Sequence, residues 1–219
     1  MLVLISVGCA SADLVDRYRE ESAQWEGDIT AAEAAVTPPA EGQPHLLFVG
    51  SSSIRLWETI ETDMAPFQVT RLGFGGAKLS DVAVYADRLT HPYTFEALML
   101  FVGNDIWGNA DDKSAEEIAA LFEYIVERTR VQHPTVPIYW IEITHSPSRW
   151  HLFGQVDEAQ RAIEAATERL PNVHFIPTKD VFLAGNGEPD PAYFIEDRLH
   201  LSEAGYAAWA ERIRQHVTP

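Results

Sequence analysis

The sequence predicts an α/β fold: a three-layer α/β/α sandwich around a five-stranded parallel sheet in flavodoxin-like order. Three observations lead to this prediction. Short, continuous apolar runs recur along the chain, stretches with helical apolar spacing separate them, and 219 residues are enough for one sizeable domain with a well-covered core. Strands that are buried on both faces and alternate with amphipathic helices are typical of a parallel sheet covered on each side.

The strands are predicted from the apolar runs, each of which is too short for a helix of ordinary length. The first begins at His45 and breaks at Gly50, where a glycine favours a turn. The predicted strands cover residues 45–49, 68–72, 97–102, 137–143 and 173–176.

The helices are predicted from apolar residues three and four positions apart. They cover residues 53–61, 79–88, 114–132, 156–169 and 202–216. Crossovers between parallel strands are right-handed, and such sheets bind ligands beyond the carboxyl ends of their strands. We therefore expect functional residues in the loops that follow the strands.

The chain before the first strand is expected to form one amphipathic helix over residues 13–36 and a linker that runs to residue 44. The helix is Ala- and Glu-rich with apolar residues at near-helical spacing, and Thr37-Pro38-Pro39 ends it. We expect the helix to pack on the main domain or shield an edge of it. The main domain then covers residues 45–219.

The first twelve residues have some features of a remnant of an export signal. They are apolar, Ala10-Ser11-Ala12 is similar to a signal cleavage site, and Gly8-Cys9 is similar to the end of a lipoprotein signal. A basic segment is missing and the apolar stretch is short. The sequence therefore leaves an exported and a cytoplasmic protein equally open. No stretch is long enough to span a membrane.

Composition excludes several classes of partner and cofactor. The net charge of −17 argues against nucleic-acid binding, which needs a basic surface, and against polyanionic substrates. Cys9 is the single cysteine, so no intramolecular disulfide forms, and no Cys/His spacing resembles a zinc site. We expect no metal, no cofactor and a small-molecule substrate. The sequence does not indicate an oligomeric state.

Two distant segments carry the parts of a nucleophilic site. A serine-rich turn, Gly50-Ser51-Ser52-Ser53, follows the first predicted strand, and Asp197-Arg198-Leu199-His200 precedes the last predicted helix. An Asp-x-x-His turn can hold one imidazole nitrogen and leave the other to take a proton from a serine. Taken alone, the serines favour a cap of the following helix, but the Asp-His pair reverses this preference and favours Ser52 as a nucleophile.

Two further segments supply candidate donors for an oxyanion. Glycines in the stretch 71–76 let the backbone approach a ligand closely, and Asn104 follows another predicted strand. The candidate donors are the backbone N–H groups of Ser52 and Gly76 and the Asn104 side chain. Asn104 could instead be a turn residue that holds its own backbone.

These four blocks, in this order, resemble the SGNH/GDSL hydrolase superfamily. The resemblance runs from about Leu46 to the end of the chain and is greatest for bacterial members with the first block Gly-Ser-Ser-Ser-Ile-Arg-Leu-Trp, as in residues 50–57. It implies the superfamily's version of the predicted sheet order. It also implies a triad of Ser52, Asp197 and His200, with oxyanion donors at Ser52, Gly76 and Asn104.

The blocks depart from the family pattern at three positions. Ser51 replaces the usual aspartate of the first block, and Arg71 stands where the second block often has asparagine. The third block, Gly103-Asn104-Asp105, is one residue shorter than the usual Gly-x-Asn-Asp. This shortening bears on the direction of the Asn104 amide.

The resemblance implies a serine esterase that forms an acyl-enzyme on Ser52 and needs no cofactor. The family acts on lipid, aryl and thio-esters and on O-acetylated sugars. Because the chain has no long apolar lid, we expect short acyl groups, with acetylated carbohydrate as the leading alcohol. The alternatives are an acyltransferase and a non-catalytic carbohydrate-binding member. Trp107, Arg149 and Trp150 are the candidate substrate-binding residues, since they follow strands on the same rim.

Overall fold

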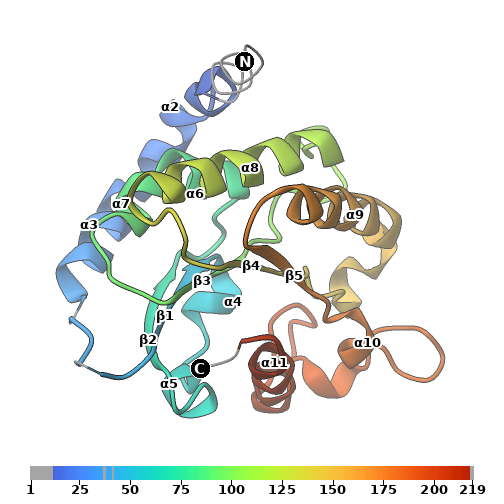
Figure 1. Cartoon of the computed structure of the whole chain (residues 1–219). Helices are drawn as coiled ribbons and strands as arrows, with labels where there is room; N and C mark the ends of the chain where they lie inside the picture. The colour runs from blue at the N-terminus through green and yellow to red at the C-terminus, as the bar shows by residue number, and fades with distance from the viewer. Residues whose placement is uncertain (1–11, 37, 41, 218–219) are drawn as a thin grey trace.

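The described residues form the predicted five-stranded parallel sheet, in the order β2-β1-β3-β4-β5 (Figure 1). The computed structural model describes residues 12–36, 38–40 and 42–217, so most of the export-signal remnant expected over 1–12 lies outside it. Every neighbouring pair of strands is parallel, which confirms the predicted fold class. The strands are β1 His45–Gly50, β2 Gln68–Gly73, β3 Ala97–Phe101, β4 Ile138–Ile141 and β5 Val173–Ile176.

Helices cover both faces of the sheet. In Figure 1, α8 and α9 lie on one side and α11 on the other. The α-helices are α2 Arg19–Ser22, α3 Glu26–Ala35, α4 Ser52–Arg55, α5 Ile60–Asp63, α6 Leu79–Val84, α7 Ala86–Thr90, α8 Ala115–Gln132, α9 Phe153–Arg169, α10 Lys179–Phe182 and α11 Glu203–His216. The 3₁₀ helices are η1 Ala23–Trp25, η2 Pro147–Leu152 and η3 Pro191–Tyr193.

The alternating direction of strand side chains divides the core in two. On β1, Leu47 and Val49 belong to one apolar cluster, while Leu46 and Phe48 belong to the other. The first cluster lies under α6, α7, α8 and α9, and the second lies under α4, α5, α10 and α11. Because both faces of β1 are buried, its sequence is a continuous apolar run rather than an alternating one.

The structure corrects the single helix expected over residues 13–36. That stretch is helical at 12–16 and then in the short segments α2, η1 and α3. Near the break, the buried Ser22 hydroxyl donates to Asp81 and the Ser22 carbonyl accepts a hydrogen bond from Tyr85. These tertiary contacts favour short turns over a continuous helix. The segment packs on the main domain, with Leu14 and Ile29 in its core.

Two further predicted helices are also divided. Residues 53–61 contain most of α4 and the start of α5, and residues 79–88 contain α6 and part of α7. The strands predicted at 97–102 and 137–143 end earlier, at Phe101 and Ile141, and the remaining residues form loops. None of the helices within the described ranges is long and apolar enough to cross a membrane.

Candidate active site

A sharp turn after β1 presents Ser52 at the carboxyl edge of the sheet. A Cβ atom at Gly50 would lie 2.1 Å from the carbonyl oxygen of Phe101, so only glycine fits there. The next backbone N–H, that of Ser51, donates to the same carbonyl at 3.1 Å. The chain then enters α4 at Ser52. Close contact with β3 therefore determines where the serine lies.

The structure brings Ser52, His200 and Asp197 together in one hydrogen-bonded chain. The Ser52 Oγ lies 2.9 Å from His200 Nε2, although 148 positions separate the two residues. The other ring nitrogen, Nδ1, lies 2.6 Å from Asp197 Oδ2. Because Nδ1 faces a carboxylate, it carries the hydrogen, which leaves Nε2 as an acceptor for the serine hydroxyl.

The loop that carries His200 is held mainly by its own backbone. Asp197 Oδ1 accepts the N–H groups of Leu199 and His200 at 2.8 and 2.9 Å. Arg198 has a φ of 59°, which turns the chain between Asp197 and His200. Partial burial raises the pKa of Asp197, but the hydrogen bonds from His200 and Leu199 outweigh that effect, so the net shift is downward. The carboxylate is thus kept ionised beside the imidazole.

Gly76 and Asn104 come from different loops that meet through one hydrogen bond. Gly76 has a φ of 89°, a conformation that favours glycine. Asn104 donates from Nδ2 to the carbonyl oxygen of the next residue, Ala77, at 3.0 Å. In the described part of the chain, the backbone N–H groups of Ser52 and Gly76 have no hydrogen-bond acceptor. Both N–H groups are therefore available to a ligand.

Arg149 fixes the direction of the Asn104 amide. Its guanidinium donates to Asn104 Oδ1 at 3.0 Å and to the Gly103 carbonyl at 2.6 Å. An arginine has only donors, so the atom facing it must be the amide oxygen, and the amide nitrogen faces Ala77. Burial lowers the pKa of Arg149 to about 10, so the group stays charged at neutral pH. The side chain of Asn104 is not bonded to its own backbone, as a turn residue's would be.

The three candidate substrate-binding residues lie in different surroundings. Arg149 lines the pocket beside Ser52. The Arg149 guanidinium carbon lies 3.7 Å from the centre of the Trp107 ring, so the two groups stack. The Trp107 indole N–H donates to the Asn104 carbonyl, and the residue is 47% exposed. Trp150 packs against Phe153 and does not line the pocket. The structure thus brings Arg149 to the pocket, Trp107 beside it and Trp150 away from it.

The loop after β4 contributes pocket residues that the sequence did not indicate. Ile143, Thr144, His145 and Ser146 line the cavity together with Ser52, Asn104 and His200. The predicted strand 137–143 extends into this loop, and its position at the carboxyl end of β4 was the available signal. Burial, reinforced by the charge of Lys179, lowers the pKa of His145 to about 4, so its ring is neutral.

The cavity at Ser52 is small. It measures about 40 Å³, enough for about three water molecules, since one needs roughly 10–15 Å³. No group of His, Cys, Asp and Glu side chains within the described ranges is arranged to hold a metal ion. The chemistry that the cavity supports is attack by a serine hydroxyl on a small electrophilic group, with a neighbouring imidazole to take the proton.

Residues 51–208 match the GDSL-like lipase/acylhydrolase family, and the chain belongs to that family. The match confirms the superfamily expected from the sequence and identifies the protein as a carboxylic ester hydrolase. A search of curated proteins finds no significant match.

Several solved structures share the fold. A Streptococcus pneumonia protein whose name refers to platelet activating factor has a TM-score of 0.75 at 18% identity, over 95% of this chain and 98% of that one. A GDSL-like lipase from Bacteroides thetaiotaomicron has a TM-score of 0.66 at 16% identity, over 92% of this chain and 96% of that one. An acetylxylan esterase from Geobacillus stearothermophilus has a TM-score of 0.66 at 16% identity, over 82% of this chain and 95% of that one. At these identities the likeness concerns the fold alone.

Proposed function

We propose that the protein is a serine esterase that hydrolyses short-chain carboxylic esters through an acyl-enzyme on Ser52. The observation that carries this proposal is the chain of contacts from Ser52 through His200 to Asp197, at 2.9 and 2.6 Å. A serine hydroxyl is a weak nucleophile until a base takes its proton. Here the proposed base, His200, is within hydrogen-bond distance of the serine, and the carboxylate that orients the ring is within hydrogen-bond distance of His200.

The reaction has two matching halves. His200 Nε2 takes the Ser52 proton while Oγ forms a bond to the ester carbonyl carbon, whose oxygen becomes an oxyanion. The tetrahedral intermediate collapses, the bond to the alcohol oxygen breaks, and His200 gives its proton to that oxygen. Water then adds to the acyl-enzyme in the same way, and Ser52 is released with the free acid. Asp197 holds the ring and stabilises its charged form.

Three donors are assigned to the oxyanion: the backbone N–H groups of Ser52 and Gly76 and the side-chain amide of Asn104. The two backbone groups have no acceptor in the described part of the chain. An amide nitrogen carries two hydrogens, and the Asn104 nitrogen uses one on Ala77. The second hydrogen is the one that we assign to the substrate.

The substrate is proposed to carry a short acyl group, with an acetylated carbohydrate as the leading candidate. A cavity of about 40 Å³ suits an acyl chain of a few heavy atoms. The half-exposed Trp107 ring beside the pocket offers a flat apolar surface for a sugar ring, and the charged Arg149 next to it suits polar groups.

An acyltransferase would use the same groups and differ only in the acceptor of the acyl group. Adding a sugar alcohol to the assay distinguishes the two, because a transferase yields the new ester and a hydrolase yields the free acid. The non-catalytic alternative needs a misassembled triad, and the contacts from Ser52 to Asp197 do not support it.

Replacement of Ser52 tests the proposed nucleophile. Ser52→Ala should abolish the release of p-nitrophenol from p-nitrophenyl acetate and prevent labelling by a fluorophosphonate. The matched control is Ser53→Ala, one position along the same helix, which should keep both. Retained turnover in Ser52→Ala, or a label found on Ser51 or Ser53, would contradict the assignment.

A series of substrates tests the proposed acyl group and alcohol. Among p-nitrophenyl esters, kcat/KM should be highest for acetate and fall as the acyl chain lengthens, because the cavity is small. Acetylated xylose and glucose should also be hydrolysed, and Trp107→Ala should raise KM for them more than for p-nitrophenyl acetate. A preference for long-chain esters would contradict the proposed acyl specificity.

A further inference from the structure

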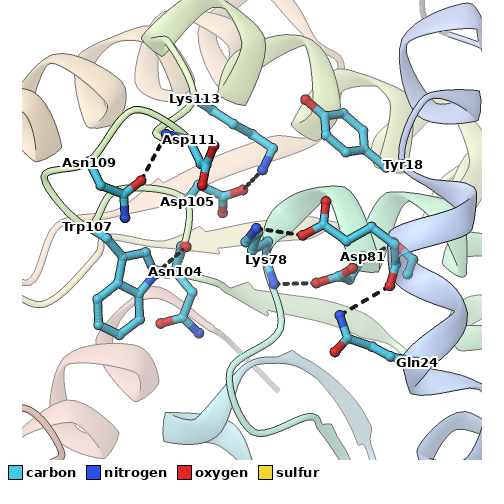
Figure 2. A network of polar contacts seen from close by, with 12 residues as sticks. Tyr18, Gln24, Lys78, Asp81, Asn104, Asp105, Trp107, Asn109, Asp111 and Lys113 are labelled. Atoms are coloured by element: carbon cyan, nitrogen blue, oxygen red, sulfur yellow. Dashed lines mark hydrogen bonds and ion pairs between the residues drawn. The ribbon is translucent and has the colours of Figure 1, made fainter.

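A network of polar contacts joins the N-terminal segment to the loops that carry Gly76 and Asn104. Figure 2 shows the residues of this network, from Tyr18 and Gln24 on the N-terminal segment to Asn104 and Trp107 at the pocket. The N-terminal segment, defined as residues 12–25, precedes residues 51–208, the part of the chain that matches the family. The match therefore does not explain why this segment contacts the residues behind those loops.

The first set of contacts runs from Ser22 to the loop after Gly76. The Ser22 hydroxyl donates to Asp81 Oδ1 at 2.6 Å, and the other carboxylate oxygen accepts the Lys78 backbone N–H at 2.8 Å. Ser22 is fully buried and Asp81 is 6% exposed. Lys78 follows Ala77, whose carbonyl oxygen receives the Asn104 amide. One carboxylate thus joins the N-terminal segment to the loop that carries Gly76 and accepts the Asn104 amide.

The second set runs from Tyr18 to the residue after Asn104. Asp105 accepts the Leu79 backbone N–H at 2.8 Å and forms an ion pair with Lys113 at 3.1 Å. The side chains of the pair are 4% and 5% exposed. The Lys113 ammonium lies 4.9 Å from the centre of the Tyr18 ring, so this ring covers the pair on the side of the N-terminal segment.

Buried charges of this kind are expensive to desolvate and contribute little net stability, so a role in fixing geometry is the better explanation. The two carboxylates hold consecutive backbone N–H groups, those of Lys78 and Leu79, directly after the Gly76-Ala77 turn. A change in either carboxylate would shift that turn and the amide bonded to it. Donors to an oxyanion must be held in place before the reaction, since they cannot adjust at no cost during it.

We infer that the N-terminal segment is a positioning element for the oxyanion donors, acting through Ser22 on Gly76 and through Tyr18 on Asn104. The inference rests on the proposed function, because it assigns those donors to the esterase reaction. Ser22 and Tyr18 contact neither the reacting serine nor the pocket. They set the direction of groups that do.

The test is the kcat of Ser22→Ala and Tyr18→Ala with p-nitrophenyl acetate. Both variants should lower kcat by about ten-fold, because misplacement of a catalytic group by 1 Å can cost up to about 10²-fold. KM should stay within about two-fold, since the acyl pocket is unchanged. Tyr18→Phe keeps the ring over Lys113 and should restore kcat, which separates the covering ring from the hydroxyl that donates to Glu117.

Arg88→Ala is the matched control for stability. Arg88 joins α7 to Glu26 and Glu33 of α3, and so fastens the neighbouring helix without touching either loop of the donors. This variant should lower the melting temperature and leave kcat unchanged. Ser22→Ala and Tyr18→Ala should differ from it by losing kcat at temperatures where they are fully folded.

A double mutant locates the effect. In Ser22→Ala/Asn104→Ala, the loss of kcat should be smaller than the product of the two single losses, because both substitutions act on the same donors. If Ser22→Ala does not fold, Tyr18→Ala provides the same comparison with Asn104→Ala.

A kcat within about two-fold of the parent in the folded variants, with a melting temperature lowered as in Arg88→Ala, would show that the segment only stabilises the fold and would overturn the inference. Failure of the proposed function gives a different result, namely an active Ser52→Ala.

Discussion

On one half of the site, Asp197 and His200 lie on an exposed loop whose hydrogen bonds are mostly to their own backbone. On the other half, Asn104 is 6% exposed and contacts side chains and carbonyls from segments far away in the chain. The Asp197 side chain is 44% exposed, whereas that of Asp105, beside Asn104, is 5% exposed.

This difference shows two ways of holding the side chains that we propose to be catalytic. The Asp-His loop needs few neighbours because a short turn fixes the spacing of its two side chains. The Asn104 amide depends on a buried arrangement that includes Arg149 and Ala77. A motif of four residues is therefore sufficient to recognise the first half, and the fold is needed to recognise the second. Substitutions in the two halves should also fail differently.

The largest effect is expected on the exposed half. His200→Ala removes the base that lies within hydrogen-bond distance of Ser52 and should lower kcat by several orders of magnitude, about 10⁴-fold or more, with a small change in KM. The melting temperature should change little, because the ring is partly exposed. His216→Ala, at the end of α11, is the matched control and should behave as the parent. A large drop in the melting temperature of His200→Ala would contradict the expected difference between the two halves.

On the buried half, Asn104→Ala should damage both activity and stability. Removing one oxyanion donor costs about 10²–10³ in kcat. The same substitution leaves the Arg149 N–H group that faces Asn104, and the Ala77 carbonyl, without that partner, which should destabilise the fold by about 1–3 kcal/mol. Kinetics and thermal unfolding of one variant measure both. Asn109→Ala, an exposed residue on the same loop, is the control. A fully active, destabilised Asn104→Ala would remove this residue from the site.

The smallest effect concerns the dependence of stability on pH. His145 has a pKa of about 4 when buried, below the 6.5 of the exposed group. The unfolded chain therefore binds a proton that the folded chain does not, and the free energy of unfolding should fall as the pH drops from about 6.5 to 4.

The variant His145→Gln should flatten this part of the pH profile by up to about 3 kcal/mol, measured by urea unfolding at several pH values. Asp197 should contribute only at lower pH, because its pKa is lowered from 3.8. An unchanged profile in His145→Gln would show that acid sensitivity does not come from this buried histidine.

The sheet could be predicted from the sequence because each strand is a short, largely apolar run between turns, and β1 and β3 are buried throughout. The match of His45–Gly50 with the predicted 45–49 is typical. The helices were less predictable where they are short. The segment 13–36 has helical spacing throughout, yet tertiary hydrogen bonds at Ser22 divide it. Helical spacing indicates which side chains share a face and contains no information on such long-range contacts.

The site was predictable where its parts are local. The spacing of Asp197 and His200 and the serine turn after β1 are visible in the sequence. The contact of Arg149 with Asn104 joins residues 45 positions apart, and that of Ser22 with Asp81 joins residues 59 apart. No short pattern contains either pair. Trp150 shows the converse, because its place after a strand suggested the pocket and its packing on Phe153 takes it elsewhere.

The position of β1 between β2 and β3 determines which part of this protein can be transferred to another chain as a folded unit. Residues 51–208 match the family, but β1 ends at Gly50, just before them. A chain trimmed to the matched stretch would lose the strand that both β2 and β3 bond to. Two bare strand edges would then face solvent, and such edges pair with other chains. Anyone who grafts or recombines this hydrolase must therefore begin no later than His45.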